Sequence, residues 1–212
     1  MAFFFITHMT NQEKDLVPQQ NTGAESNTES SVSFDTAEEA QQFFEVVQQR
    51  LLNVNNWHHL AGTGTADFQL TDADGNDVNR AAQKGDHFKI DIPGPGPATG
   101  DGYDWVQIEA IESLQEKNKD CIIIRVRPAT NPNNERQDVA HFFSPEATSN
   151  FMAKREGNTV TAAVYGRNEK PNRDAEKLVD KARNTAVATG AVSGFSKLQW
   201  KSLVNGLLKL EG

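Results

Sequence analysis

Arg167 and Glu169 are separated by one residue in the polar stretch VYGRNEKPN, residues 164–172. An arginine can hold a carboxylate or a phosphate through paired hydrogen bonds, and a buried glutamate can transfer protons. The structural interpretation is a corner in which Gly166 lets the backbone turn after a strand and Asn172 caps a following helix. We favour the corner, and the alternative is an enzyme site built on this polar cluster.

Two further arginines, Arg125 and Arg127, share one side of a predicted strand. Gln107 and Glu109 face the corresponding side of the preceding predicted strand. Cross-strand charge pairing is therefore the expected role of both arginines. The alternative is a guanidinium pair that holds an anionic ligand.

The sequence contains only incomplete versions of the motifs that indicate a metal site, a phosphate site or a catalytic nucleophile. DADGND, residues 72–77, has its glycine at the fourth position instead of the sixth of a calcium loop. The glycines of residues 94–102 alternate with prolines, which have no amide hydrogen to offer a phosphate. His58 and His59 are adjacent and therefore point in different directions, and Cys121 lies in the apolar run CIIIRV. The sequence thus predicts no cofactor, no metal and no catalytic residue, and it favours a protein that is not an enzyme.

Composition excludes several classes of partner. The net charge is −8, and basic residues are not interleaved with aromatic ones, so we expect no nucleic acid partner. No stretch approaches the roughly 20 apolar residues that a membrane span needs. The single cysteine fits a reducing compartment. We therefore expect a soluble, cytoplasmic protein.

A chain of 212 residues is long enough for one domain with a sizeable core. Residues 1–32 are acidic and polar, and they predict a flexible tail, followed by a single domain over residues 33–212. The apolar FFFI near the start is too short for a signal peptide. Translation from Met1 and translation from Met9 are alternatives.

Helical periodicity marks both ends of that domain. TAEE predicts a capping box between Thr36 and Glu39, and apolar residues then recur at helical spacing to Val54. Two closing helices are predicted over residues 172–186 and 200–208, separated by an interruption that contains Gly190 and Gly194.

Between the helices, apolar and polar residues alternate in segments that are separated by turns and loops. Such strands have one apolar face and one mostly polar face, which is typical of an antiparallel sheet that is covered on one side. The sequence therefore predicts an α+β domain with a predominantly antiparallel sheet, on whose apolar face the N-terminal and C-terminal helices pack. The predicted strands lie at residues 66–70, 88–92, 106–110, 122–127 and 160–164.

The order of these elements resembles the START-like helix-grip (SRPBCC-type) superfamily over about residues 31–210. The resemblance rests on a short VSF strand, a helix ending in NNWHHLAG, antiparallel strands and a long C-terminal helical region. It implies a curved sheet that wraps a C-terminal helix and often encloses a cavity for apolar ligands. It implies no particular binding residue.

We therefore expect a non-catalytic module that binds a small apolar or amphipathic molecule between the sheet and the helices. A protein-interaction or homodimerisation module is an alternative, in which the last helix docks through Trp200, Leu203 and Leu207. An enzyme with a polar cluster around Arg167 and Glu169 is a further alternative. The candidate ligand-binding residues are Phe68, Phe88, Ile90, Trp105, Trp200, Arg125, Arg127, Arg167 and Glu169.

Overall fold

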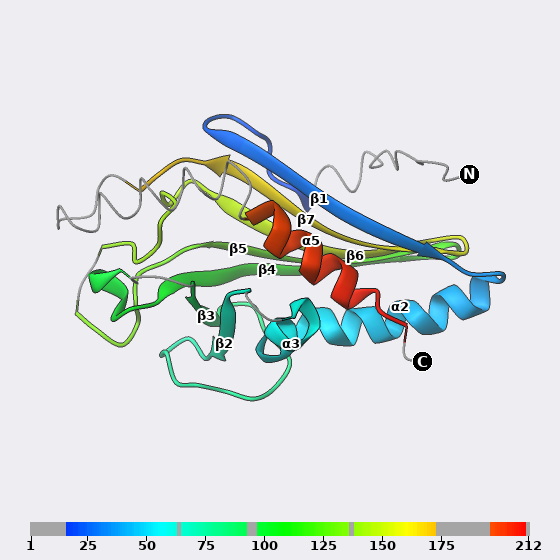
Figure 1. Ribbon diagram of the computed structural model, residues 1–212, viewed down its shortest axis with the longest axis horizontal. Coiled ribbons are helices and arrows are strands. Elements are labelled where there is room, and N and C mark those ends of the chain that lie inside the picture. The colour runs from blue at the N-terminus through cyan, green and yellow to red at the C-terminus, as the bar shows by residue number, and fades with distance from the viewer. Residues whose placement is uncertain (1–15, 63–64, 93–96, 136–137, 173–195, 211–212) are drawn as a thin grey trace.

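One antiparallel sheet of seven strands forms the centre of the computed structural model, which describes residues 16–62, 65–92, 97–135, 138–172 and 196–210 (Figure 1). The strand order is β1-β7-β6-β5-β4-β3-β2. All neighbouring strands run antiparallel. The bounds are β1 Ala24–Ser33, β2 Asp67–Thr71, β3 His87–Asp91, β4 Asp104–Glu116, β5 Lys119–Pro128, β6 Thr148–Glu156 and β7 Thr159–Glu169.

Helices α2 and α5 pack on one face of this sheet, and α5 lies over its strands in Figure 1. The predicted capping box is present at the start of α2, because the Glu39 amide donates to Thr36 Oγ1 at 3.2 Å and the Thr36 amide donates to Glu39 Oε2 at 3.1 Å. The predicted α+β fold class, with an antiparallel sheet and helices on one face, is confirmed. The helical elements are α2 Ala37–Leu52, η1 Val54–Asn56, α3 Trp57–Ala61, η2 Ala98–Gly100 and α5 Ser196–Leu207.

Each of the five predicted strands is present, and their alternation separates the two faces of the sheet. On β5, Ile122, Ile124 and Val126 face the helices and belong to the main core. Strand β6 was missed because both of its faces are buried: Phe151 belongs to the main core, whereas Met152 packs in a second cluster on the other face. A strand that is buried on both sides has no clear alternation of apolar and polar residues.

The predicted flexible tail over residues 1–32 is wrong over residues 24–32, because strand β1 begins at Ala24 and pairs with β7 along its length. Strand β1 can be polar because it lies at the edge of the sheet, where every second side chain is exposed. Its backbone is held by hydrogen bonds to β7, which need no apolar side chains. Side chains add to the pairing, with Ser31 Oγ 2.8 Å from Thr161 Oγ1. The first 15 residues of the predicted tail lie outside the described residues.

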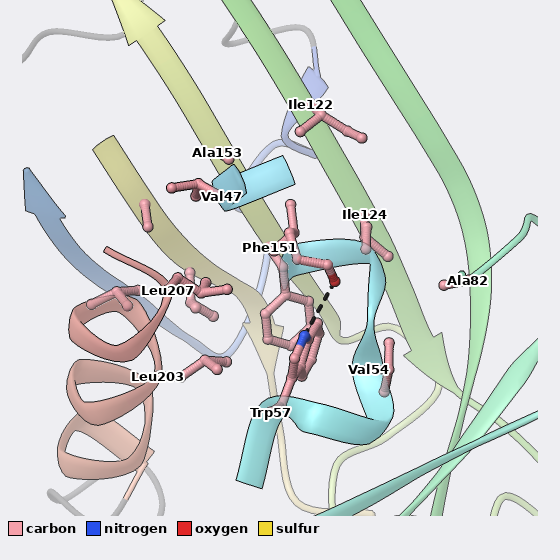
Figure 2. Close-up of a cluster of buried hydrophobic side chains, with 14 of the residues drawn as sticks. Val47, Val54, Trp57, Ala82, Ile122, Ile124, Phe151, Ala153, Leu203 and Leu207 are labelled. Atoms are coloured by element: carbon pink, nitrogen blue, oxygen red, sulfur yellow. Dashed lines mark hydrogen bonds between the residues drawn. The ribbon is translucent and has the colours of Figure 1, made fainter. Parts of the chain in front are cut away.

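Trp57 is the centre of the main core (Figure 2). The side chain is fully buried, and its ring centroid lies 4.6 Å from that of Phe151 and 5.4 Å from that of Phe68. Its indole Nε1 donates to the Leu51 carbonyl at 3.1 Å, which satisfies the one polar atom of the ring. Leu203 of α5 lies on one side of the ring, and Val47 of α2 belongs to the same cluster farther along the sheet, near Ala153 (Figure 2).

Helix α5 packs directly against α3. A Cβ at Gly206 would overlap the Leu60 carbonyl, so the absence of a side chain at this position allows the close approach. Arg50 of α2 donates to the Leu207 carbonyl at 2.9 Å and to the Lys209 carbonyl at 2.7 Å, which satisfies carbonyl groups at the C-terminal end of α5. The predicted last helix is thereby confirmed.

The other predicted closing helix, over residues 172–186, and the interruption at Gly190 and Gly194 lie outside the described residues. Among the helices of the described segments, none has the length and apolar character needed to cross a membrane.

Candidate functional site

A hollow opens between the inner face of the sheet and the N-terminal part of α5, with a cavity volume of about 60 Å³. Its floor comes from strands β3 to β7, and one side comes from Gln199 and Trp200 of α5. Most of the residues that line the hollow are aromatic or aliphatic, and a few polar residues lie among them. The described lining residues are Phe88, Ile90, Ile92, Val106, Val126, His141, Phe142, Phe143, Ser149, Phe151, Glu169, Gln199 and Trp200.

The loop that supplies His141, Phe142 and Phe143 is held by buried polar side chains. The Asn172 amide group donates to the carbonyl of His141 at 3.1 Å and to that of Val139 at 3.0 Å. The Phe142 amide donates to Asp104 Oδ1 at 3.0 Å. Because these bonds fix the loop backbone at several points, its aromatic side chains form a defined wall of the hollow.

The carboxylate of Glu169 is the one acidic group among the described lining residues. Asn168 adopts a left-handed conformation with φ of 57°, and the chain at this point brings the Glu169 side chain back over Gly166. A Cβ at position 166 would overlap both Glu169 Oε1 and Ser26 Oγ, so the glycine leaves the room that the carboxylate occupies. Ser26 Oγ donates to Glu169 Oε1 at 3.0 Å.

Burial raises the pKa of the Glu169 carboxyl, while the Ser26 hydrogen bond and the charge of Arg167 act in the opposite direction. The residue is only 7% exposed, so water solvates its charge poorly. A group with these properties in an apolar hollow can accept hydrogen bonds from a ligand or hold a positive charge.

Of the other polar lining residues, His141, Ser149 and Gln199, the first and the last have side chains that contact the backbone. His141 Nδ1 lies 2.9 Å from the Phe143 amide and accepts its hydrogen, which places the proton of a neutral ring on Nε2. Gln199 Oε1 accepts from the Ala66 amide at 3.4 Å. Both side chains are therefore oriented by backbone contacts.

The structure brings four of the candidate residues together, since Phe88, Ile90, Trp200 and Glu169 all line the hollow. Phe68 lies behind the wall, with its ring centroid 6.3 Å from that of Trp200. Trp105 is buried but does not line the hollow, and its indole Nε1 donates to the Gly100 carbonyl at 3.1 Å.

Arg125 and Arg127 do not join the site. They alternate along β5 with the inward-facing Ile124 and Val126. Arg125 pairs with Glu112 at 2.6 Å, and Arg127 pairs with Glu109, so the predicted cross-strand charge pairing is present. The partner of Arg125 is Glu112 because an irregularity between Ile108 and Ala110 shifts the register of β4.

Arg167 is also directed away from the hollow. Its guanidinium donates to Asn27 Oδ1 at 2.7 Å and lies 5.5 Å from the centre of the Tyr165 ring. Glu169 instead lines the hollow and accepts from Ser26. The predicted turn at Gly166 is wrong, because β7 continues through Gly166 to Glu169 and pairs there with Ser26 and Ser149. The helix that Asn172 was predicted to cap lies outside the described residues. Arg167 and Glu169 lie near the end of β7 and do not form one joint cluster.

Sequence reasoning missed the loop residues His141, Phe142 and Phe143, together with Ser149 on the floor. The signal that could have found the loop is the HFF run itself, since adjacent aromatic residues in an irregular segment need a surface on which to pack. The two adjacent histidines lie within α3, and His58 Nδ1 lies 3.6 Å from Asp67 Oδ1. Within the described segments, no group of three or more His, Cys, Asp or Glu side chains could hold a metal ion.

Comparison with known proteins gives no match to a family model and no match to a curated protein. Among solved structures, the hypothetical protein jhp0584 from Helicobacter pylori has 13% identity and a TM-score of 0.48, with 97% of this chain and 98% of that chain covered. Ara h 8.0201 has 11% identity and a TM-score of 0.32, with coverage of 87% and 99%. The major latex-like protein 151 from Panax ginseng has 13% identity and a TM-score of 0.33, with coverage of 80% and 96%. Similarities of this size assign neither a family nor a function to the chain.

Proposed function

We propose that the hollow binds a small, mainly apolar organic molecule, and that the chain is a non-catalytic binding module of the helix-grip type. The observation that carries the proposal is an open hollow whose walls are mostly aromatic and aliphatic, with a few oriented polar groups. Ligand sites in proteins generally have this composition. A cavity of about 60 Å³ suits a single ring or a short branched chain, because one water molecule needs roughly 10–15 Å³ by the same kind of measure.

The interaction-module alternative is less well supported. Leu203 and Leu207 are each 1% exposed and belong to the core of their own chain, while Trp200 lines the hollow. The apolar stripe of α5 is therefore already covered. A homodimer would have to use another surface, and native mass spectrometry would detect it.

The net charge of −8 also favours a small ligand over nucleic acid. A cytoplasmic location remains part of the proposal, and it rests on the single, buried Cys121.

The test is thermal unfolding with increasing concentrations of 2-phenylethanol, a neutral one-ring compound. Binding to the folded state should raise the melting temperature of the wild type in a concentration-dependent way. The control variant is Ser149→Leu, which places an apolar side chain on the floor of the hollow and should remove the effect. The proposal is wrong if the wild type shows no shift, or if the variant shows the same shift.

A further inference from the structure

The Glu169 carboxylate is buried and forms no ion pair with a described residue, and the charge of Arg167 only partly offsets the effect of burial. Among the described residues, Ser26 donates a hydrogen bond to Glu169 Oε1, and none forms an ion pair with Glu169. The basic residue nearest along the strand, Arg167, donates its hydrogen bonds to the Ser26 and Gly166 carbonyls and to Asn27. Burying a charge is costly unless a partner compensates it, and the described residues leave Glu169 Oε2 able to accept a further hydrogen bond.

A second buried carboxylate in the same sheet, that of Asp120, has its negative charge compensated by an arginine. Asp120 accepts from Arg155 Nε at 2.7 Å, and both side chains are only 4% exposed. That pair lies within the protein and leaves no room for a ligand charge. Glu169 has comparable burial, but it faces an open hollow and has only a hydroxyl as its described partner.

The aromatic walls of the hollow favour a positively charged ligand, as the Glu169 carboxylate does. The rings of Phe88, Phe151 and Trp200 line the hollow together with Phe142 and Phe143. The face of an aromatic ring attracts cations, and the attraction increases where water is excluded. A ligand carboxylate, in contrast, would meet Glu169 as a like charge.

We propose that the preferred ligand of the hollow is a small organic amine, with its ammonium group at the Glu169 carboxylate and its apolar body between Phe88, Phe151 and Trp200. This inference rests on the proposed function of the hollow as a ligand site. The inference adds that the ligand is positively charged and that Glu169 is the residue that selects this charge. Glu169 therefore has a role in specificity in addition to its bond with Ser26.

The experiment measures the affinities of three one-ring compounds by calorimetric titration. Phenethylamine carries a positive charge, 2-phenylethanol is neutral and 3-phenylpropionate is negative. A charged hydrogen bond should make the wild type bind phenethylamine about tenfold to a hundredfold more tightly than 2-phenylethanol, and 3-phenylpropionate more weakly than either.

Two variants assign the preference to the carboxylate. Glu169→Gln keeps the size of the side chain and removes its charge, so it should abolish the preference for phenethylamine over 2-phenylethanol. Ser26→Ala is the matched control, because it removes the described partner of Glu169 and keeps the charge, so the preference should persist. The comparison of the three compounds in the wild type tests the proposal even if a variant fails to fold.

The outcomes separate the two proposals. Equal affinities for the amine and the alcohol in the wild type would overturn the amine preference and leave the hollow as a site for apolar ligands. A preference that survives in Glu169→Gln would likewise overturn the role of the carboxylate. If none of the three compounds binds, the proposed function fails together with this inference.

Discussion

The two ends of the sheet's inner face differ in how the space above them is filled. At one end Trp57 is fully buried among residues of α2, α5 and the sheet (Figure 2). Toward the other end, and sharing Phe88 and Phe151 with this core, the strands and α5 line an open hollow. Strand β6 crosses both regions, with Ala153 in the packed core, Ser149 on the floor of the hollow and Phe151 between them. The fold thus provides its stability at one end and keeps space for a ligand at the other.

The first prediction compares a tryptophan from each region. Trp57→Ala should lower the free energy of unfolding by about 3–5 kcal/mol, because it removes a fully buried ring and leaves a cavity. Trp200→Ala should cost less than half as much, because this ring is half-buried and already lines open space. Urea unfolding measures both changes, and equal losses would contradict the difference between the two ends.

The second prediction concerns the packing of α5 against α3. Gly206→Ala should cost about 1–3 kcal/mol, since the new methyl group would overlap the Leu60 backbone and push the helix outward. Leu198→Ala on the same helix is the control, because Leu198 is 72% exposed and its loss should change stability by no more than about 0.5 kcal/mol. A Gly206→Ala variant with wild-type stability in urea would show that α5 is not closely fixed.

The third prediction uses the raised pKa of Glu169. The folded protein holds this proton more tightly than the unfolded chain, so the stabilisation is complete below the ordinary pKa of 4.5 and is lost as the pH rises through the higher pKa of the folded state. Relative to Glu169→Gln, the wild type should therefore become less stable as the pH rises from 4.5. Urea unfolding across this pH range measures the difference between the two proteins.

The control for the third prediction is Glu146→Gln, in the exposed part of the chain. The Ser144 hydrogen bond lowers the pKa of Glu146, so its contribution is present above the ordinary pKa and is lost as the pH falls through the lower one. The two variants should thus change the pH dependence in opposite directions. If both variants changed the pH dependence of stability in the same direction, the effect of burial on the pKa of Glu169 would be contradicted.

Local patterns in the sequence predicted most of the fold. The capping box at Thr36 and Glu39 depends on residues three positions apart, and alternation within a strand depends on neighbours, so both could be read from the chain. Only the end of β1 was predicted, as the short VSF strand. The rest could not be read from the chain, because its pairing with β7 joins residues 126 to 145 positions apart and its side chains are mostly polar.

The candidate site was less predictable than the fold. An aromatic residue in an alternating strand can pack in a core, line a hollow or do both, and the sequence does not say which. Phe68 and Phe88 have the same pattern and both belong to the main core, but of these two only Phe88 also lines the hollow. The position of Glu169 depends further on the left-handed conformation of Asn168.

The most direct test of the two-region account is to enlarge one small residue at each end of the inner face of β6 and to measure unfolding in urea. Ser149→Leu fills the hollow and should change the free energy of unfolding by less than about 1 kcal/mol. Ala153→Leu enters the packed core, where no space is left, and should cost about 1–3 kcal/mol. If both substitutions cost the same, the hollow is not a space that the fold keeps open, and the account is contradicted.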